Sequence, residues 1–186
     1  MNGLIKDIKI YYEILGSGIP IIMLHGWGPD HRILKGCMEP LFQDCNSKFK
    51  RIYFDLPGMG LTHGSQWINS TDKMLELVML FIEEIIPNED YIIVGESYGG
   101  YLARGLVKYH SNRIKGLFLL CPMAKQENQR KNSPPFTVLE KDRSLDDLLN
   151  EEEKQYFGSI NVIQTRAVWQ RFKEDILPNY KSCLSK

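Results

Sequence analysis

The sequence lacks the features that mark membrane, nucleic-acid-binding and disulfide-bonded proteins. Its 186 residues hold 23 Lys and Arg against 23 Asp and Glu, without a basic stripe, so neither nucleic acid nor an anionic membrane is an expected partner. No apolar run reaches the roughly 20 residues of a membrane span, and the amino terminus has no signal-peptide pattern. We therefore expect a cytoplasmic protein.

Paired cysteines are also missing. Cys37, Cys45, Cys121 and Cys183 have neither Cys-x-x-Cys spacing nor histidine companions, which argues against a disulfide framework and against a zinc site. We expect reduced, partly buried thiols, no metal and no cofactor.

The most informative stretch runs from Ile92 to Arg104. A short apolar run leads into Gly95-Glu96-Ser97-Tyr98-Gly99, and a helical pattern follows. A Gly-x-Ser-x-Gly motif between a strand and a helix predicts a sharp turn that exposes the serine hydroxyl. The glycines are needed because so tight a turn leaves little room for side chains. Ser97 heads the helix, so the Tyr98 amide and the positive end of the helix would face a developing oxyanion.

Two further segments also read as a strand that ends in a turn. Residues 21–24 are apolar throughout, as in a strand covered on both faces, and His25-Gly26-Trp27-Gly28 follows them. Residues 51–60 form the second, in which Asp55 is predicted to fix the turn through hydrogen bonds of its own side chain. His63 reads as a solvated loop residue, and a base recruited to Ser97 is the alternative.

With these three segments in this order, the chain resembles the α/β-hydrolase superfamily, in its lid-bearing serine esterase and aminopeptidase-like branch. The resemblance implies an α/β fold: a mostly parallel sheet with flanking helices over residues 1–124, and an incomplete helical lid over residues 125–186. It also implies the roles of the site residues. Ser97 is the expected nucleophile, the amides of Trp27 and Tyr98 the expected oxyanion hole, and His25 and Gly26 the expected loop beside the substrate, a small ester or amide.

Helical spacing predicts the elements around these segments. Helices are expected over residues 30–42, 72–86 and 98–109. Thr71 is the expected cap of the second helix, and Leu102, Leu106 and Tyr109 are expected to face the sheet from the third. Residues 126–135 are polar and rich in proline, which is typical of a loop.

The lid-like region is predicted to be helical. Asn150 fits a capping box, and Thr165 fits the cap of a further helix with an apolar stripe. Trp169 and Phe172 lie on this stripe, where they either pack within the lid or, as the family resemblance implies, line a substrate pocket.

In the family, the catalytic acid and histidine follow the serine in chain order. The only histidine after Ser97 is His110, at the end of the next predicted helix, and residues 121–124 offer no carboxylate. We therefore expect the last two strands and the closing helix of such a fold to be absent from this chain. Two hypotheses remain: a serine hydrolase with impaired turnover, or an inactive fragment or binding scaffold. With the strand order that the family resemblance implies, residues 114–120 are then expected to form an apolar sheet edge, open to a second copy or to a complementing segment.

Overall fold

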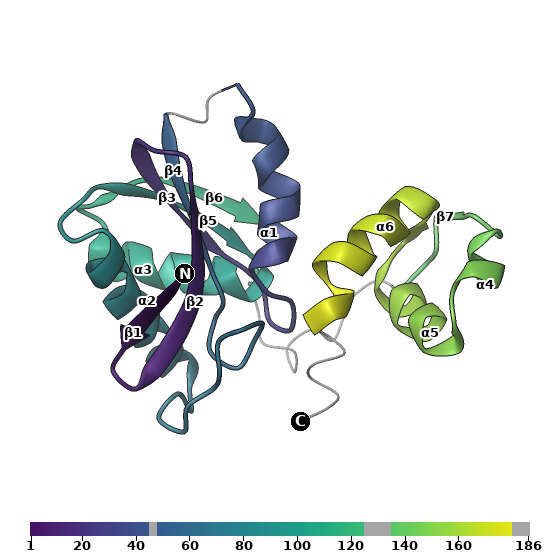
Figure 1. Ribbon diagram of the computed structural model, residues 1–186, viewed down its shortest axis with the longest axis horizontal. Helices are drawn as coiled ribbons and strands as arrows, with labels where there is room; N and C mark the ends of the chain where they lie inside the picture. The colour runs from purple at the N-terminus through teal and green to yellow at the C-terminus, as the bar shows by residue number, and fades with distance from the viewer. Residues whose placement is uncertain (45–47, 125–134, 180–186) are drawn as a thin grey trace.

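The computed structural model describes residues 1–44, 48–124 and 135–179, and its centre is a six-stranded sheet (Figure 1). The strands lie in the order β1 (Asn2–Ile5), β2 (Ile8–Leu15), β4 (Phe49–Phe54), β3 (Ile19–Leu24), β5 (Tyr91–Glu96) and β6 (Ile114–Leu120). β1, β2 and β4 pair antiparallel, whereas β4, β3, β5 and β6 run parallel. The carboxyl ends of β3, β4 and β5 therefore lie side by side at one end of the strands, where binding sites of open α/β sheets are found.

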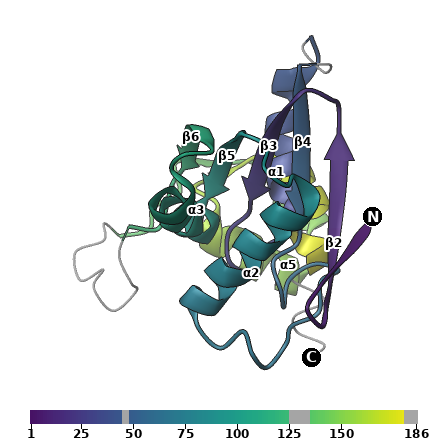
Figure 2. The same cartoon turned by 90° about the vertical axis from the view of Figure 1, so that its left-hand side faces the viewer.

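Helices cover both faces of the sheet (Figures 1 and 2). α2 (Thr71–Ile85) and α3 (Ser97–His110) lie on one face, and α1 (His31–Met38) lies on the other. Side chains of β3 alternate between the two resulting cores. Ile22 and Leu24 pack under α2 and α3, while Ile21 and Met23 pack under α1. The predicted strand that is apolar on both faces is thereby confirmed.

Several sequence predictions need correction. Ser70, not Thr71, caps α2, because its side chain accepts a hydrogen bond from the Lys73 amide; Thr71 is the first helical residue. Leu102 and Leu106 of α3 are buried, but Tyr109 is 57% exposed, since it lies in the last turn of the helix beside the Lys108 ammonium.

The first predicted helix is also shorter than expected. It ends at Met38, and a 3₁₀ turn, η1 (Glu39–Phe42), follows with Pro40 in it, because proline cannot supply the amide that an α-helix needs. Cys37 and Cys121 are free thiols, as expected, but both are exposed and not partly buried. Cys45, Cys183 and most of the predicted loop at 126–135 lie outside the described residues.

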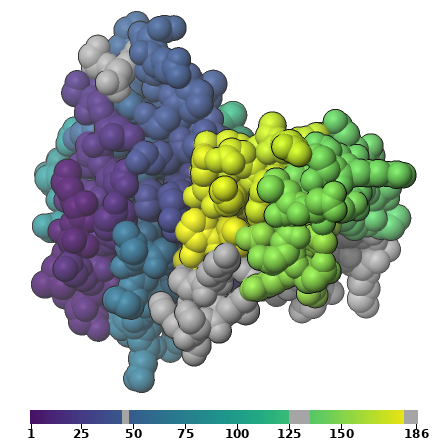
Figure 3. All heavy atoms as spheres, turned by 45° about the vertical axis from the view of Figure 1, so that its right-hand side comes forward, coloured from purple at the N-terminus to yellow at the C-terminus, as the bar shows by residue number. Residues whose placement is uncertain are grey.

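The C-terminal residues form a small helical layer with its own core. It contains α4 (Leu145–Leu148), α5 (Glu151–Ile160), α6 (Arg166–Asp175) and the short strands β7 (Glu140–Lys141) and β8 (Ile163–Gln164). The predicted capping box at Asn150 and the predicted cap at Thr165 are both confirmed. α6 packs against α1, as Figure 3 shows, so closely that a Cβ atom on Gly36 would overlap Arg171. Within the described residues, no helix has both the length and the apolar character that crossing a bilayer requires.

Candidate active site

The chain turns sharply between β5 and α3, and Ser97 stands at the turn. Its φ angle is 50°, in the left-handed region that residues other than glycine rarely adopt. A Cβ atom on Gly95 would lie 2.7 Å from the Gly100 Cα, and one on Gly99 would lie 2.0 Å from the Leu24 carbonyl oxygen. The predicted strained turn with obligatory glycines is therefore present, and strain of this kind clusters at functional sites.

The loop after β3 lies directly against this turn. A Cβ atom on Gly26 would lie 3.1 Å from the Ser97 Cβ and 2.4 Å from Oε2 of Glu96. The rings of Trp27 and Tyr98 meet edge to face, with centroids 5.5 Å apart and an interplanar angle of 88°. The structure thus brings Gly26, Trp27, Ser97 and Tyr98 together from two segments that are distant in the sequence.

His25 fixes the loop after β3 through hydrogen bonds of both of its ring nitrogens. Its Nε2 accepts a hydrogen bond from the Leu56 amide at 3.0 Å, so its Nδ1 carries the proton and donates to the Gly26 carbonyl at 2.7 Å. Complete burial lowers the pKa of this imidazole, which keeps it neutral. His25 therefore joins the loops after β3 and β4, and both of its ring nitrogens are engaged there.

The other three histidines also lie in the described part of the chain, and none of them hydrogen-bonds to Ser97. His110 ends α3, and its Nδ1 lies 2.8 Å from the Tyr91 hydroxyl. His63 is exposed in the loop after β4. His31 lies at the start of α1 with both ring nitrogens beside carboxylates. A general base acts within hydrogen-bond reach of the proton that it takes, and none of these imidazoles has such a bond to Ser97 in this structure.

Glu96 is the carboxyl group next to the serine. Burial raises the pKa of its carboxyl group, and the nearby Gly26 amide acts in the opposite direction. Its Oε2 is buried and has no hydrogen-bond partner in the part of the chain that the structure describes. This oxygen lies against Gly26, so the close packing of the loop on the turn leaves no room for a side chain at that position.

A second polar cluster lies under the loop after β4. Asp55 accepts hydrogen bonds from the amides of His31 and Leu61, at 2.9 and 2.8 Å, and lies 2.7 Å from the His31 Nδ1. The His31 Nε2 lies 3.3 Å from Oε1 of Glu13. The expectation that Asp55 fixes its turn is confirmed, but the sequence did not indicate that His31 is its partner.

Asp30, His31 and Asp55 also have ligand atoms within 4.8 Å of one another, close enough to share a metal ion. Their atoms are already engaged. Asp30 caps α1 and pairs with the Arg32 guanidinium, and Asp55 is bonded to His31 and Leu61. We therefore assign this cluster to support of the loop at residues 55–61.

We expect the His31→Gln variant to lose stability in a pH-dependent manner. Burial acts to lower the pKa of His31, but the hydrogen bond to Asp55 and the charges of Asp55, Asp30 and Glu13 outweigh it and raise that pKa above 6.5. A raised pKa stabilises the fold fully below the unfolded value, and this contribution is lost as the pH rises through the folded value. Urea unfolding should show a larger loss at about pH 5 than at about pH 9.

His63→Gln is the control, because His63 lies in an exposed loop. If His31→Gln loses the same stability at both pH values, His31 does not carry a stabilising positive charge in the folded protein at low pH, and the account is contradicted.

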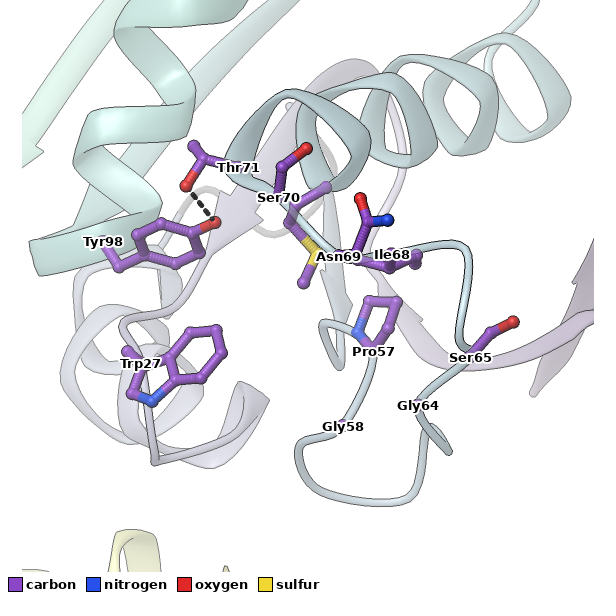
Figure 4. A pocket seen from close by; sticks show the side chains of 11 residues that line it. Trp27, Pro57, Gly58, Gly64, Ser65, Ile68, Asn69, Ser70, Thr71 and Tyr98 are labelled. Carbon is purple, nitrogen blue, oxygen red and sulfur yellow. Dashed lines mark hydrogen bonds between the residues drawn. The ribbon is translucent and has the colours of Figure 1, made fainter.

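A pocket opens beside the turn, with a volume of about 450 Å³ (Figure 4). Trp27 and Tyr98 form one wall, Pro57 faces them, and Ile68 and Met74 add apolar surface. The Tyr98 hydroxyl donates to Oγ1 of Thr71 at 3.3 Å, which joins α3 to the start of α2.

Two residues predicted to line a substrate pocket lie elsewhere. Trp169 and Phe172 stack on each other with ring centroids 5.7 Å apart, and both are buried in the core of the C-terminal helices with Phe157. Their helical stripe predicts this burial as readily as it predicts a pocket.

Asn179 is a site residue that the sequence did not reveal. Its side chain donates to the Gly28 carbonyl and accepts from the Gly60 amide at 2.9 Å, so it ties the loops after β3 and β4 to the C-terminal layer. No sequence motif surrounds this asparagine, and its partners lie more than 100 residues away in the sequence, so sequence analysis could not identify it.

Comparison with known proteins agrees with this geometry. A family model described as the alpha/beta hydrolase fold matches residues 19–183. A pimeloyl-[acyl-carrier protein] methyl ester esterase of Legionella pneumophila is 28% identical over 110 residues, covering 59% of this chain and 41% of its own length. The corresponding esterase of Nitrosomonas europaea is 32% identical over 112 residues, which are 60% of this chain and 40% of that protein. The chain spans about two fifths of the length of these curated relatives.

Among solved structures, an alpha/beta superfamily hydrolase from Oenococcus oeni PSU-1 is similar over all of this chain and 69% of its own. The TM-score is 0.82 and the sequence identity 31%. A thermophilic esterase from Thermogutta terrifontis aligns over 96% of this chain and 65% of its own with a TM-score of 0.64. At 18% identity, it shares the fold alone.

Proposed function

This chain belongs to the α/β-hydrolase fold family, and on that premise we propose that it is a serine hydrolase of a small carboxylic ester or amide, with Ser97 as nucleophile. The observation that carries the proposal is the strained turn at Ser97, with the Gly26 loop packed against it. A serine held in this way presents its hydroxyl beyond the carboxyl ends of the strands, where a substrate carbonyl can approach it.

We propose the following chemistry. The Ser97 Oγ attacks the carbonyl carbon, and the amides of Trp27 and Tyr98 donate hydrogen bonds to the oxygen that becomes negative. The amino end of α3 adds its partial positive charge at the same place. The alcohol or amine then leaves with a proton, and water hydrolyses the acyl-serine bond to release the acid and restore the hydroxyl.

Activation of the serine is the weak step in this chain. An unassisted hydroxyl is a poor nucleophile at neutral pH, and none of the chain's four histidines, all of them described, hydrogen-bonds to Ser97. Loss of one triad member costs about 10⁴ to 10⁶ in turnover. We therefore propose a slow reaction for this chain by itself. An inactive fragment or binding scaffold with the hydrolase fold is the second candidate, and the same arrangement of histidines favours it.

The relatives favour an ester over an amide as substrate, because the two esterases are named for a methyl ester. We further propose that α4, α5 and α6 are part of a lid, since α6 packs on α1 and Asn179 holds both loops beside Ser97.

The test is the time course of p-nitrophenolate release from p-nitrophenyl acetate. If Ser97 is acylated faster than the acyl group is hydrolysed, up to one equivalent per chain is released in an early burst, followed by a slow steady rate. The Ser97→Ala variant should lack the burst. Identical time courses for the two proteins would contradict the proposal.

We propose that the edge of β6 pairs with a second copy of the chain. β6 is an edge strand within the described residues, and Leu117 and Phe118 on it are 41% and 49% exposed. An apolar edge with unpaired backbone groups is a template for pairing with another strand, and a lysine on such an edge opposes that pairing.

Light scattering is therefore expected to give more than the monomer mass for the parent chain and a value nearer the monomer for Phe118→Lys. Leu139→Lys is the matched control, because Leu139 is exposed outside the six-stranded sheet. A parent chain that is monomeric at all concentrations would refute the pairing.

A further inference from the structure

The pocket in Figure 4 shares two residues with the proposed oxyanion hole. Trp27 and Tyr98 are expected to offer their amides to the reacting carbonyl, and their side chains form a wall of the pocket. A group bound in the pocket is therefore a close neighbour of the scissile bond. The volume of about 450 Å³ falls within the range of roughly 300 to 1,000 Å³ that is usual for small-molecule sites.

The lining of the pocket carries no charge. None of its eleven residues is Asp, Glu, Lys, Arg or His, and Trp27, Pro57, Ile68 and Met74 give it an apolar surface. A charged group that entered would lose water without gaining an ionic partner, which is costly.

The hydrogen-bonding groups of the lining are mostly engaged with the protein. The Tyr98 hydroxyl donates to Thr71, the Ser70 side chain caps α2, and the Ser65 hydroxyl donates to Asp7 at 3.1 Å. The Asn69 side chain and the Trp27 indole N–H are the exceptions, since neither has a hydrogen bond in the described part of the chain. An amide offers both a donor and an acceptor to a neutral polar group.

We infer that this pocket selects esters whose pocket-bound part is uncharged and mainly apolar, and that it rejects a carboxylate in the same position. Trp27 and Ile68 are the specificity-determining side chains, because they form apolar surface on the wall shared with the oxyanion hole and on the loop before α2. The inference rests on the proposed hydrolase function and narrows its substrate class.

The test compares p-nitrophenyl hexanoate with p-nitrophenyl hemiadipate, which differ in replacing the terminal methyl group by a carboxylate. We expect the initial acylation rate constant to favour hexanoate by at least about tenfold. In Ile68→Lys the new ammonium pairs with the carboxylate, so this preference should fall by at least about tenfold. Leu148→Lys makes the same change on the exposed surface of α4 and should behave like the parent.

Failure of the inference and failure of the proposed function have different signatures. If Ser97→Ala releases p-nitrophenolate like the parent, the hydrolase function itself fails. If release depends on Ser97 but the two esters react equally, or Ile68→Lys keeps the parent's preference, the pocket inference alone is overturned.

A binding measurement on Ser97→Ala needs no turnover. Ethyl butyrate should quench tryptophan fluorescence at concentrations at least about tenfold lower than monoethyl succinate does. Trp27→Phe in the same background should lose the response, because Trp27 lines the pocket. Equal quenching by both ligands would overturn the inference even if acylation were too slow to measure.

Discussion

Replacing Gly99 with alanine is expected to lower the free energy of unfolding by at least about 3 kcal/mol. The new methyl group would lie 2.0 Å from the Leu24 carbonyl oxygen and 2.6 Å from that of His25. Both neighbours are backbone atoms. Leu24 ends β3 and pairs with Gly95 of β5 in the middle of the sheet, so its carbonyl cannot move without disturbing strand pairing, and the His25 carbonyl follows directly after it. Because α3 must approach β3 this closely, the cost is structural and does not depend on catalysis.

Urea unfolding followed by circular dichroism measures this loss. Gly158→Ala is the matched control, because its nearest neighbour beyond its own helix is 3.9 Å away, and alanine favours a helix over glycine by about 1 kcal/mol. We expect the control to be unchanged or slightly stabilised. A Gly99→Ala variant as stable as the parent would contradict the close packing of α3 on β3.

Replacing Gly26 with alanine is expected to slow acylation of Ser97 by about 10² to 10³ while the fold is retained. The methyl group would meet Glu96 Oε2 at 2.4 Å and the Ser97 Cβ at 3.1 Å. Side chains can give way where backbone cannot, but relieving these contacts shifts the loop away from the turn. The Trp27 amide moves with the loop, and an oxyanion donor that is displaced loses most of its effect.

The rate constant of the p-nitrophenyl acetate burst measures this effect, and circular dichroism confirms the fold. Gly116→Ala is the control, since a Cβ atom there meets only Ile92 side-chain atoms at an ordinary 3.5 Å. An unchanged burst in Gly26→Ala would show that the loop after β3 takes no part in acylation.

The sequence predicted the framework of the site because that framework is local. An apolar run followed by Gly95, Ser97 and Gly99 specifies a strand, a turn and a helix without reference to the rest of the chain. The same holds for the strand at residues 21–24, where an unbroken run of apolar residues indicates that both faces of the strand are buried.

The contacts that support the site could not be predicted, since they join segments that only the fold brings together. His31 of α1 pairs with Glu13 of β2 and with Asp55 in the loop after β4, and Asn179 hydrogen-bonds to Gly28 from near the other end of the chain. Ser70 and Thr71 are neighbours and are both favourable capping residues. Amino-acid preferences alone therefore could not tell which of the two begins the helix.

The central claim is that Ser97 is a nucleophile, and intact-mass spectrometry with a fluorophosphonate probe tests it most directly. The probe reports attack by the serine oxygen itself, whether or not turnover follows. Because Ser97 has no histidine partner, we predict slow labelling that reaches one adduct per chain on prolonged incubation in the parent and in Ser159→Ala, whose serine is exposed on α5, and none in Ser97→Ala. An unlabelled parent chain, or labelling that survives in Ser97→Ala, would contradict the claim.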